Sequence, residues 1–358
     1  MKATINHGSM TVMLALVVLL ATPNENDVVN FEGSKCSRRS ARKREQIGNL
    51  LNSIQSPLFD IEGIVTPSSF VSQLHIETLD DAPAIEWSLY PNLDPQGGGL
   101  LKADSPRATR KRRQIEAFVH IIRPILRRRD ASVSNVGQLI VDAGSGAGNL
   151  AIPLARLLER GVLAIDVNDI ALDRLRARDH SVTTLCADLA SPNIDLPPNA
   201  AIVCSLHACG AATDLAIQLA TRRGLPFCVS PCCTAKALTV RQAFSSSNSY
   251  GPSTSFHRSG SPLHMTYPRS NWLKSCLPSI DAAVDYYSQI AKVADVGLGP
   301  QTPKSQREHQ RLAKVIVELD RLAGVVERHE YSVGIFRIQD HDDYGKSEIM
   351  IGIPLPTL

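Results

Sequence analysis

The sequence lacks a marked excess of charge, because 38 lysines and arginines stand against 35 aspartates and glutamates and leave a formal net charge of +3. So small an imbalance excludes a chain that is committed as a whole to nucleic acid. The basic residues are densest in two runs, residues 35–44 and 107–113. Either run suits a solvated face or a phosphate-contacting patch, and charge alone does not choose between them.

Long apolar runs are also missing. The run of 12 residues from Met10 to Ala21 is too short to span a bilayer, so no membrane-spanning segment is predicted. Its length suits a signal-peptide core, but the positive region before it is thin and the cleavage pattern of small residues is absent. We expect residues 1–46 to form a leader, which is either a targeting segment or an unstructured or non-native stretch. A cytoplasmic location is favoured over an organelle, plastid-like or secretory, that this leader would address.

The eight cysteines are neither dense nor regularly spaced, which argues against a secreted disulfide framework, and no Cys-x-x-Cys occurs. Five of them lie in or beside apolar, strand-like runs: Cys204, Cys209, Cys228, Cys232 and Cys233. This pattern indicates reduced thiols in an intracellular protein.

The domain organisation follows from length and periodicity. A chain of 358 residues with 43% hydrophobic residues suits one large α/β domain with an extension. Residues 47–106 show no sustained period and are predicted to be a poorly ordered extension that carries a few short elements, none of them assigned. Strands and helices alternate from residue 107 to residue 358, which predicts a parallel sheet covered on both faces. The Ser-, Gly- and Pro-rich residues 245–261 are expected to form a flexible insertion.

The expected elements of this domain are assigned from the pattern of apolar residues. Helices are predicted over residues 114–126, 149–159, 171–178, 212–221 and 304–325. Strands are predicted over residues 138–141, 162–165, 182–186, 200–206, 226–229, 331–338 and 349–353, the last two as an antiparallel hairpin.

A glycine-rich turn follows the first of these strands. It carries Asp142, Gly144, Gly146 and Gly148, where a backbone close to a bound nucleoside leaves room only for glycine. A dinucleotide fingerprint requires glycine where Asn149 stands, and a P-loop requires Gly-Lys-Ser/Thr, which is absent. The acid at Asp142 would repel a pyrophosphate. The turn therefore favours a cationic ligand without phosphates.

S-adenosylmethionine is such a ligand, with an ammonium group, a sulfonium and a ribose diol. Asp166 ends the second strand, where its carboxylate can accept both ribose hydroxyls, and Asp188 follows the third strand within reach of an adenine amino group. Ser145 and Ser205 complete the predicted cofactor contacts. A turn alone suits a structural connection, and a lone acid suits a helix cap, but the combination favours the cofactor.

Several short motifs resemble the seven-strand methyltransferases, and within them the methyltransferase domain of glutathione S-transferase C-terminal domain-containing protein and of methyltransferase-like 25 proteins. The resemblance implies a Rossmann-like class I α/β sheet of strand order 3-2-1-4-5-7-6, with the glycine loop at the methionine moiety, Asp166 at the ribose and Asp188 at the adenine. The sequence departs from the relatives in showing no glutathione-transferase region in its first 100 residues. The motifs are residues 107–114, the glycine loop, residues 206–210 with Thr213 and Asp214, residues 231–233, residues 267–270 and residues 351–354.

Histidine and cysteine follow the fourth and fifth strands, as His207, Cys209, Cys232 and Cys233, and are predicted to face the transferred methyl group. Three interpretations stay open. Small thiols pack beneath the cofactor, or one of the adjacent cysteines is a nucleophile activated by His207, or the group binds zinc. Metal is not predicted, because adjacent cysteines do not make the Cys-x-x-Cys chelate.

The methyl acceptor is predicted to be a macromolecule, with RNA favoured over protein. The tRNA ribose methyltransferases that act in the acceptor stem are similar in carrying a His-x-Cys-Gly and a Cys-Cys pair, and ribose methylation needs a base such as His207. The Asn/Asp-Pro-Pro-Tyr motif of many amino-group methyltransferases is absent. Arg110, Lys111 and Arg269 are the predicted contacts with substrate.

The leading hypothesis is an S-adenosylmethionine-dependent methyltransferase. The alternative is a non-catalytic protein of the same fold that serves as a binding module or scaffold, against which the intact set of glycines and acids speaks. A thiol-based or glutathione-linked redox protein is the third hypothesis, and no Cys-x-x-Cys supports it.

Overall fold

The computed structural model describes residues 74–79, 85–97, 101–130, 137–234, 265–295, 304–338 and 348–356, and over residues 74–79 it describes the backbone alone. The expected leader over residues 1–46 and the expected insertion over residues 245–261 lie outside these ranges, as does most of the extension. Among the described helices, none is long and apolar enough to cross a membrane.

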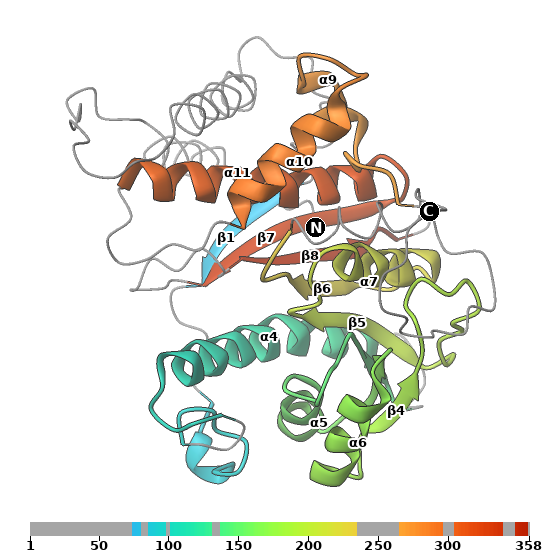
Figure 1. Ribbon diagram of the computed structural model, residues 1–358. Coiled ribbons are helices and arrows are strands. Elements are labelled where there is room, and N and C mark those ends of the chain that lie inside the picture. The colour runs from blue at the N-terminus through green and yellow to red at the C-terminus, as the bar shows by residue number, and fades with distance from the viewer. Residues whose placement is uncertain are drawn as a thin grey trace, which may run out of the picture.

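One mixed sheet of eight strands forms the centre of the molecule (Figure 1). Its spatial order is β1-β7-β8-β6-β5-β2-β3-β4. Without β1, this order is the predicted 3-2-1-4-5-7-6, which is confirmed. The strands are β1 (Leu74–Leu79), β2 (Leu139–Ala143), β3 (Gly161–Asp166), β4 (Thr183–Cys186), β5 (Ala200–Leu206), β6 (Phe227–Ser230), β7 (Tyr331–Ile338) and β8 (Glu348–Pro354).

The edge strand β1 was not predicted, and it pairs in parallel with β7 in the register Leu74 opposite Val333. The predicted C-terminal hairpin is confirmed. Strand β8 runs antiparallel to both β7 and β6, with Ile351 opposite Gly334 on one side and Cys228 on the other. All other pairs of neighbouring strands are parallel.

Helices cover both faces of the sheet, as the nearly continuous apolar strands predict. Neighbouring residues of β2 show the two faces, because Val141 packs into one core cluster and Ile140 into the other. The Ile140 face is covered by α4 (Pro106–Asp130), α5 (Ala151–Leu158) and α6 (Asp169–Arg178). The Val141 face is covered by α7 (Ala211–Arg222), α9 (Asn271–Cys276), α10 (Ala283–Ala294) and α11 (Lys304–Val326).

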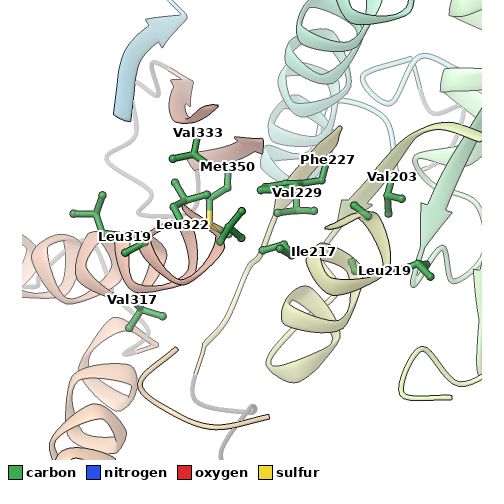
Figure 2. Packing of buried hydrophobic residues seen from close by; sticks show 14 of the residues in the cluster. Val203, Ile217, Leu219, Phe227, Val229, Val317, Leu319, Leu322, Val333 and Met350 are labelled. Atoms are coloured by element: carbon green, nitrogen blue, oxygen red, sulfur yellow. The ribbon is translucent and has the colours of Figure 1, made fainter. Parts of the chain in front are cut away.

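Figure 2 shows part of the core on the Val141 face, where α7 and α11 pack against the sheet. Val229 from β6 and Met350 from β8 are fully buried there, and so is Leu322 from α11. A core this continuous holds the strand ends at fixed positions relative to one another.

The helices α9 and α10 were not predicted, and α4 begins eight residues before its predicted start. The reason for the early start is a local cap, because the Ser105 hydroxyl accepts a hydrogen bond from the Ala108 N–H at 3.2 Å. Pro106 takes the first helical position, where its missing N–H is not needed. The basic run over residues 107–113 therefore forms the first turns of α4.

Candidate cofactor and methyl-transfer site

The candidate site lies where the parallel strands β2, β3, β5 and β6 end. Their register places Asp142 opposite Ala164 and Cys204, and Leu206 opposite Ser230. All four carboxyl ends therefore meet at one edge of the sheet, which is where open α/β sheets bind their ligands. The structure thus brings the predicted glycine loop, the two acids and the histidine-cysteine group to the same edge.

The glycine loop turns sharply between β2 and α5. Gly144, Gly146 and Gly148 have φ angles of 75°, 53° and 78°, a left-handed conformation that side chains disfavour. The N–H groups of Gly144 and Ser145 donate to the Ile165 carbonyl at 2.8 Å and 3.1 Å, which ties the loop to β3. A Cβ added to Gly146 would meet no heavy atom of the described residues within 4 Å. The loop is therefore open at the position predicted to face the cofactor.

Asp142 is the most buried acid of this edge, with 1% of its surface exposed. Burial is the main reason that its pKa rises to about 7, and the Ala151 N–H and Lys111 act in the opposite direction. Its Oδ2 atom is buried and has no hydrogen-bond partner among the described residues. An unsatisfied buried carboxylate is unfavourable in isolation, so this atom points to a ligand that donates to it.

Lys111 comes from the first turns of α4 and is close enough to Asp142 for their charges to interact. It is 5% exposed, and burial lowers its pKa to about 8, with Asp142 opposing the shift. A lysine so enclosed is a poor contact for a surface phosphate. Its predicted contact with substrate stays a prediction, and its place beside the glycine loop also suits a carboxylate of the cofactor.

Asp166 is held in a fixed orientation at the end of β3. One carboxylate oxygen accepts the Gly146 N–H at 2.7 Å, and the other accepts the Asn168 N–H at 2.8 Å. Each oxygen keeps a lone pair for a further donor such as a ribose hydroxyl. Asp188 is exposed, and its Oδ1 accepts the Ala190 N–H at 2.9 Å, which leaves Oδ2 available.

The two predicted serines differ in their surroundings. Ser145 is 8% exposed, and its Oγ has no partner among the described residues, like the Asp142 Oδ2. Ser205 is 1% exposed, and its hydroxyl donates to the Ala143 carbonyl at 2.8 Å. Ser205 thereby joins the ends of β5 and β2, and a direct contact between its side chain and the cofactor stays a prediction.

S-adenosylmethionine fits this set of groups. Its ammonium matches the unpartnered oxygen of Asp142, its carboxylate matches Lys111, and its ribose diol matches the oriented Asp166. A dinucleotide would instead place its pyrophosphate against the Asp142 carboxylate, which electrostatics opposes.

The histidine-cysteine group is assembled by two backbone hydrogen bonds between the segments that follow β5 and β6. The His207 N–H donates to the Ser230 carbonyl at 3.0 Å, and the Gly210 N–H donates to the Cys233 carbonyl at 3.2 Å. The Thr213 hydroxyl also donates to the Ala208 carbonyl and holds the first segment onto α7. These contacts bring the His-x-Cys and Cys-Cys motifs together.

Three thiols form a cluster as a result, which we call the cysteine cluster: Cys209, Cys232 and Cys233, whose Sγ atoms all lie within 4.8 Å of one another. The Cys232 and Cys233 Sγ atoms are 3.9 Å apart. Adjacent cysteines do not make the Cys-x-x-Cys chelate on which the sequence argument about metal rests. The fold nevertheless brings a third thiol to the Cys232–Cys233 pair, because Cys209 follows β5 and the pair follows the neighbouring strand β6. All three side chains are half-buried.

The pKa values of these thiols diverge. The pKa of Cys232 is raised to about 12, mainly by its hydrogen bond with Cys209 and further by burial. A hydrogen bond with His207 acts in the opposite direction and lowers this pKa. Burial raises the pKa of Cys233, whereas the hydrogen bond from Cys232 lowers the pKa of Cys209. Of the three, Cys209 is therefore the thiol that ionises most readily.

His207 has a φ angle of 67°, a left-handed conformation that is uncommon outside glycine. Its side chain is exposed at the edge of the sheet and lies beside the Cys232 thiol. Backbone strain of this kind often occurs where a side chain must be presented to a ligand.

A buried charge network beside the site was not predicted. Asp214 on α7 is bound by the fully buried Arg321 of α11, whose Nε lies 3.3 Å from Oδ1, and by the Tyr267 hydroxyl at 3.0 Å. Arg269 adds an ion pair with Asp214 at 3.5 Å. The network accounts structurally for Asp214 and for the motif at residues 267–270. The predicted contact of Arg269 with substrate stays a prediction.

Arg110 lies on the first turns of α4 and is half-buried. Arg107, one turn earlier, is exposed and close enough to Lys111 to lower the pKa of that lysine. The basic start of α4 thus borders the cofactor side of the site.

Residues 110–240 match a protein-family model described as "Methyltransferase domain". Over these residues the chain is similar to a methyltransferase domain. The match begins in α4 and extends past the cysteine cluster, so it includes the carboxyl ends of β2, β3, β5 and β6. The resemblance that the short motifs indicate is thereby confirmed.

Curated relatives carry the family name that the short motifs indicate. The glutathione S-transferase C-terminal domain-containing protein of Homo sapiens is 25% identical over 274 residues, which cover 76% of this chain and 37% of the relative. Its homolog in Drosophila melanogaster is 27% identical over 274 residues, which cover 75% of this chain and 40% of the relative. The chain therefore matches less than half the length of these relatives.

Solved structures overlap with this domain only in part. The S-adenosylmethionine-bound amino pentose methyltransferase CalS10 of Micromonospora echinaspora is 19% identical, with a TM-score of 0.28, and covers 35% of this chain and 54% of its own. The Thermoplasma acidophilum protein 1320 is 18% identical, with a TM-score of 0.29, and covers 44% of this chain and 77% of its own. Overlaps of this extent carry no argument about the reaction.

Proposed function

We propose that this protein transfers a methyl group from S-adenosylmethionine to a macromolecule, with RNA favoured over protein. The cofactor assignment is carried by the buried Oδ2 atom of Asp142, which has no hydrogen-bond partner among the described residues. The loop that contains Asp142 also lies within the residues that match the methyltransferase family model. The cofactor supplies an electrophilic methyl group on its sulfonium.

The residues of the glycine loop and its neighbours bind and orient the cofactor in this proposal. Asp142 accepts the ammonium, Lys111 donates to the carboxylate, and Asp166 accepts the ribose hydroxyls while Gly146 keeps it in place. Asp188 contacts the adenine amino group, and Ser145 supplies a further hydroxyl. Because these groups are fixed before the cofactor binds, little reorganisation is required.

The acceptor lies beside His207, at the ends of β5 and β6. We assign His207 the role of general base for a hydroxyl acceptor, since its exposed ring can take a proton from solvent-accessible substrate. We assign no nucleophile to Cys232 or Cys233, because the pKa of each is raised and a thiolate is the reactive form.

The preference for RNA rests on the basic start of α4 and on the similarity of the His-x-Cys-Gly and Cys-Cys motifs to those of tRNA ribose methyltransferases. Arg107, Arg110 and Arg113 lie in the first turns of α4, and Arg107 is close enough to Lys111 to lower the pKa of that lysine. Phosphate contacts of this kind position a nucleic acid without reading its sequence.

The test is methyl transfer from S-adenosylmethionine labelled in its methyl group to total RNA and to total protein from the same cell extract. We expect label in the RNA fraction, loss of that label with His207→Ala, and retention of cofactor binding by this variant. Label in protein alone would move the acceptor to protein. No transfer by a folded protein that binds the cofactor would favour the non-catalytic binding module.

A further inference from the structure

We propose that the cysteine cluster binds one zinc ion through the thiolates of Cys209, Cys232 and Cys233. This goes beyond the proposed methyl transfer, which does not require a metal. The assignment rests on where the fold places three sulfur atoms that are far apart in the sequence.

The spacing of the sulfurs matches zinc. Zinc binds thiolates at about 2.3 Å in tetrahedral geometry, which places two sulfurs of one site roughly 3.8 Å apart. The Sγ atoms of Cys232 and Cys233 are 3.9 Å apart, and the third sulfur lies within 4.8 Å of both. Small rotations of the side chains therefore suffice to enclose an ion.

The segments that carry the thiols are held in place by contacts that do not involve sulfur. The Gly210 N–H donates to the Cys233 carbonyl at 3.2 Å and joins the two segments directly. The Thr234 N–H donates to Asp295 at 2.6 Å, and the Thr234 hydroxyl donates to the Ala291 carbonyl at 3.0 Å, both at the end of α10. The sulfur atoms are thus preorganised for a ligand.

The donor set selects the kind of ion. Thiolates prefer zinc or copper(I) to magnesium or calcium, which take oxygen ligands. Among the described residues the cluster offers three ligands, fewer than the four cysteines that common iron-sulfur clusters use. Three protein ligands leave a fourth zinc position for water or for the acceptor, as in catalytic zinc sites.

His207 completes the surroundings without being one of the three ligands. Its left-handed backbone, with a φ angle of 67°, is fixed by the hydrogen bond from its N–H to the Ser230 carbonyl. The ring lies beside the Cys232 thiol, where a donated hydrogen bond would stabilise a metal-bound thiolate. The ring's second nitrogen stays available for the acceptor.

The experiment measures metal in the full-length protein, purified without chelators, by inductively coupled plasma mass spectrometry. We expect about one zinc ion per chain, and a near-complete loss of zinc in the double variant Cys232→Ser/Cys233→Ser. The matched control is Cys276→Ser, which removes a half-buried thiol on α9 outside the cluster and should keep the zinc.

A second measurement needs no variant and so does not depend on the folding of one. The zinc of the wild-type protein is exchanged for cobalt(II), whose thiolate charge-transfer absorption reports sulfur ligands. Alkylation of individual cysteines is then followed by mass spectrometry with and without zinc. We expect zinc to protect Cys209, Cys232 and Cys233 and to leave the alkylation of Cys276 unchanged.

Four results would overturn the proposal: a folded wild-type protein that takes up neither zinc nor cobalt, a disulfide between two of the three cysteines in the protein as purified, copper in place of zinc, or zinc retained by the double variant. Titration of S-adenosylmethionine into the same preparation distinguishes a failure of the zinc proposal from a failure of the proposed methyl transfer. Cofactor binding without metal would reject the zinc site alone.

Discussion

Asp142 and Asp214 are two carboxylates buried to almost the same extent, 1% and 2% exposed, and they have opposite surroundings. Asp214 is bound by Arg321, Arg269 and the Tyr267 hydroxyl. Asp142 keeps one buried oxygen without a partner among the described residues, and burial raises its pKa to about 7. A buried carboxylate whose two oxygens are both bound joins elements of the scaffold, whereas a buried oxygen without a partner indicates where a ligand binds.

The largest expected effect is on stability. Asp214→Ala should lower the free energy of unfolding by about 3–5 kcal/mol, because it leaves Arg321 buried without its counterion. Urea unfolding measures this. Arg223→Gln, which removes an exposed ion pair with Asp195, serves as the control and should change little. A loss in Asp214→Ala as small as in the control would contradict the structural role of the network.

Asp142→Asn should have the opposite profile. Its affinity for S-adenosylmethionine should fall by about 2–5 kcal/mol, because a charge-assisted contact with the ammonium is lost. The free energy of unfolding should change little, since burial disfavours the charge of Asp142 and its Oδ2 has no hydrogen-bond partner among the described residues. Calorimetric titration and urea unfolding on the same preparation check both halves. Equal cofactor affinity of variant and wild type would remove Asp142 from the site.

The raised pKa of Asp142 predicts a pH dependence of cofactor binding. The ionised carboxylate of Asp142 is the form that binds the cofactor. The pKa of Asp142 in the cofactor-free protein is about 7, so below this pH a proton competes with the cofactor. Affinity should weaken as pH falls from 7, by up to about tenfold per unit for one proton, and should level off above 7. Titrations between about pH 5.5 and pH 7.5 measure the slope, which Asp142→Asn should abolish. A flat wild-type profile would contradict the assignment.

The smallest expected effect is on the free energy of unfolding of two glycine-to-alanine variants, which together distinguish backbone strain from contact with the cofactor. Gly146 and Gly224 have φ angles of 53° and 58°, and a Cβ at either would meet no described heavy atom within 4 Å. Alanine at either position should therefore lower the free energy of unfolding by about 1–2 kcal/mol through strain alone. Only Gly146→Ala should also weaken cofactor binding. An equal effect of both variants on binding would place the cofactor elsewhere.

The fold could be predicted wherever the information is local. The apolar runs of β2, β5 and β7 and the glycine turn have clear patterns, and the sheet order followed from the resemblance. Pairings between distant segments were not accessible in this way. Strand β1 pairs with a strand more than 250 residues later, and Arg321 meets Asp214 across 107 residues.

The site shows the same division. The positions of Asp142 and Asp166 at strand ends were predicted, because strand ends can be read from the sequence. The cluster of three thiols was not predicted, because it depends on backbone hydrogen bonds between two segments that follow neighbouring strands. The burial of Lys111 likewise depends on how α4 lies against the sheet.

Calorimetric titration of S-adenosylmethionine into the wild-type protein tests the central claim most directly. The account predicts binding of one molecule per chain with micromolar affinity, about −8 kcal/mol, and competition by the demethylated product. Absence of heat and of competition, in a protein whose circular dichroism shows it to be folded, would contradict the account.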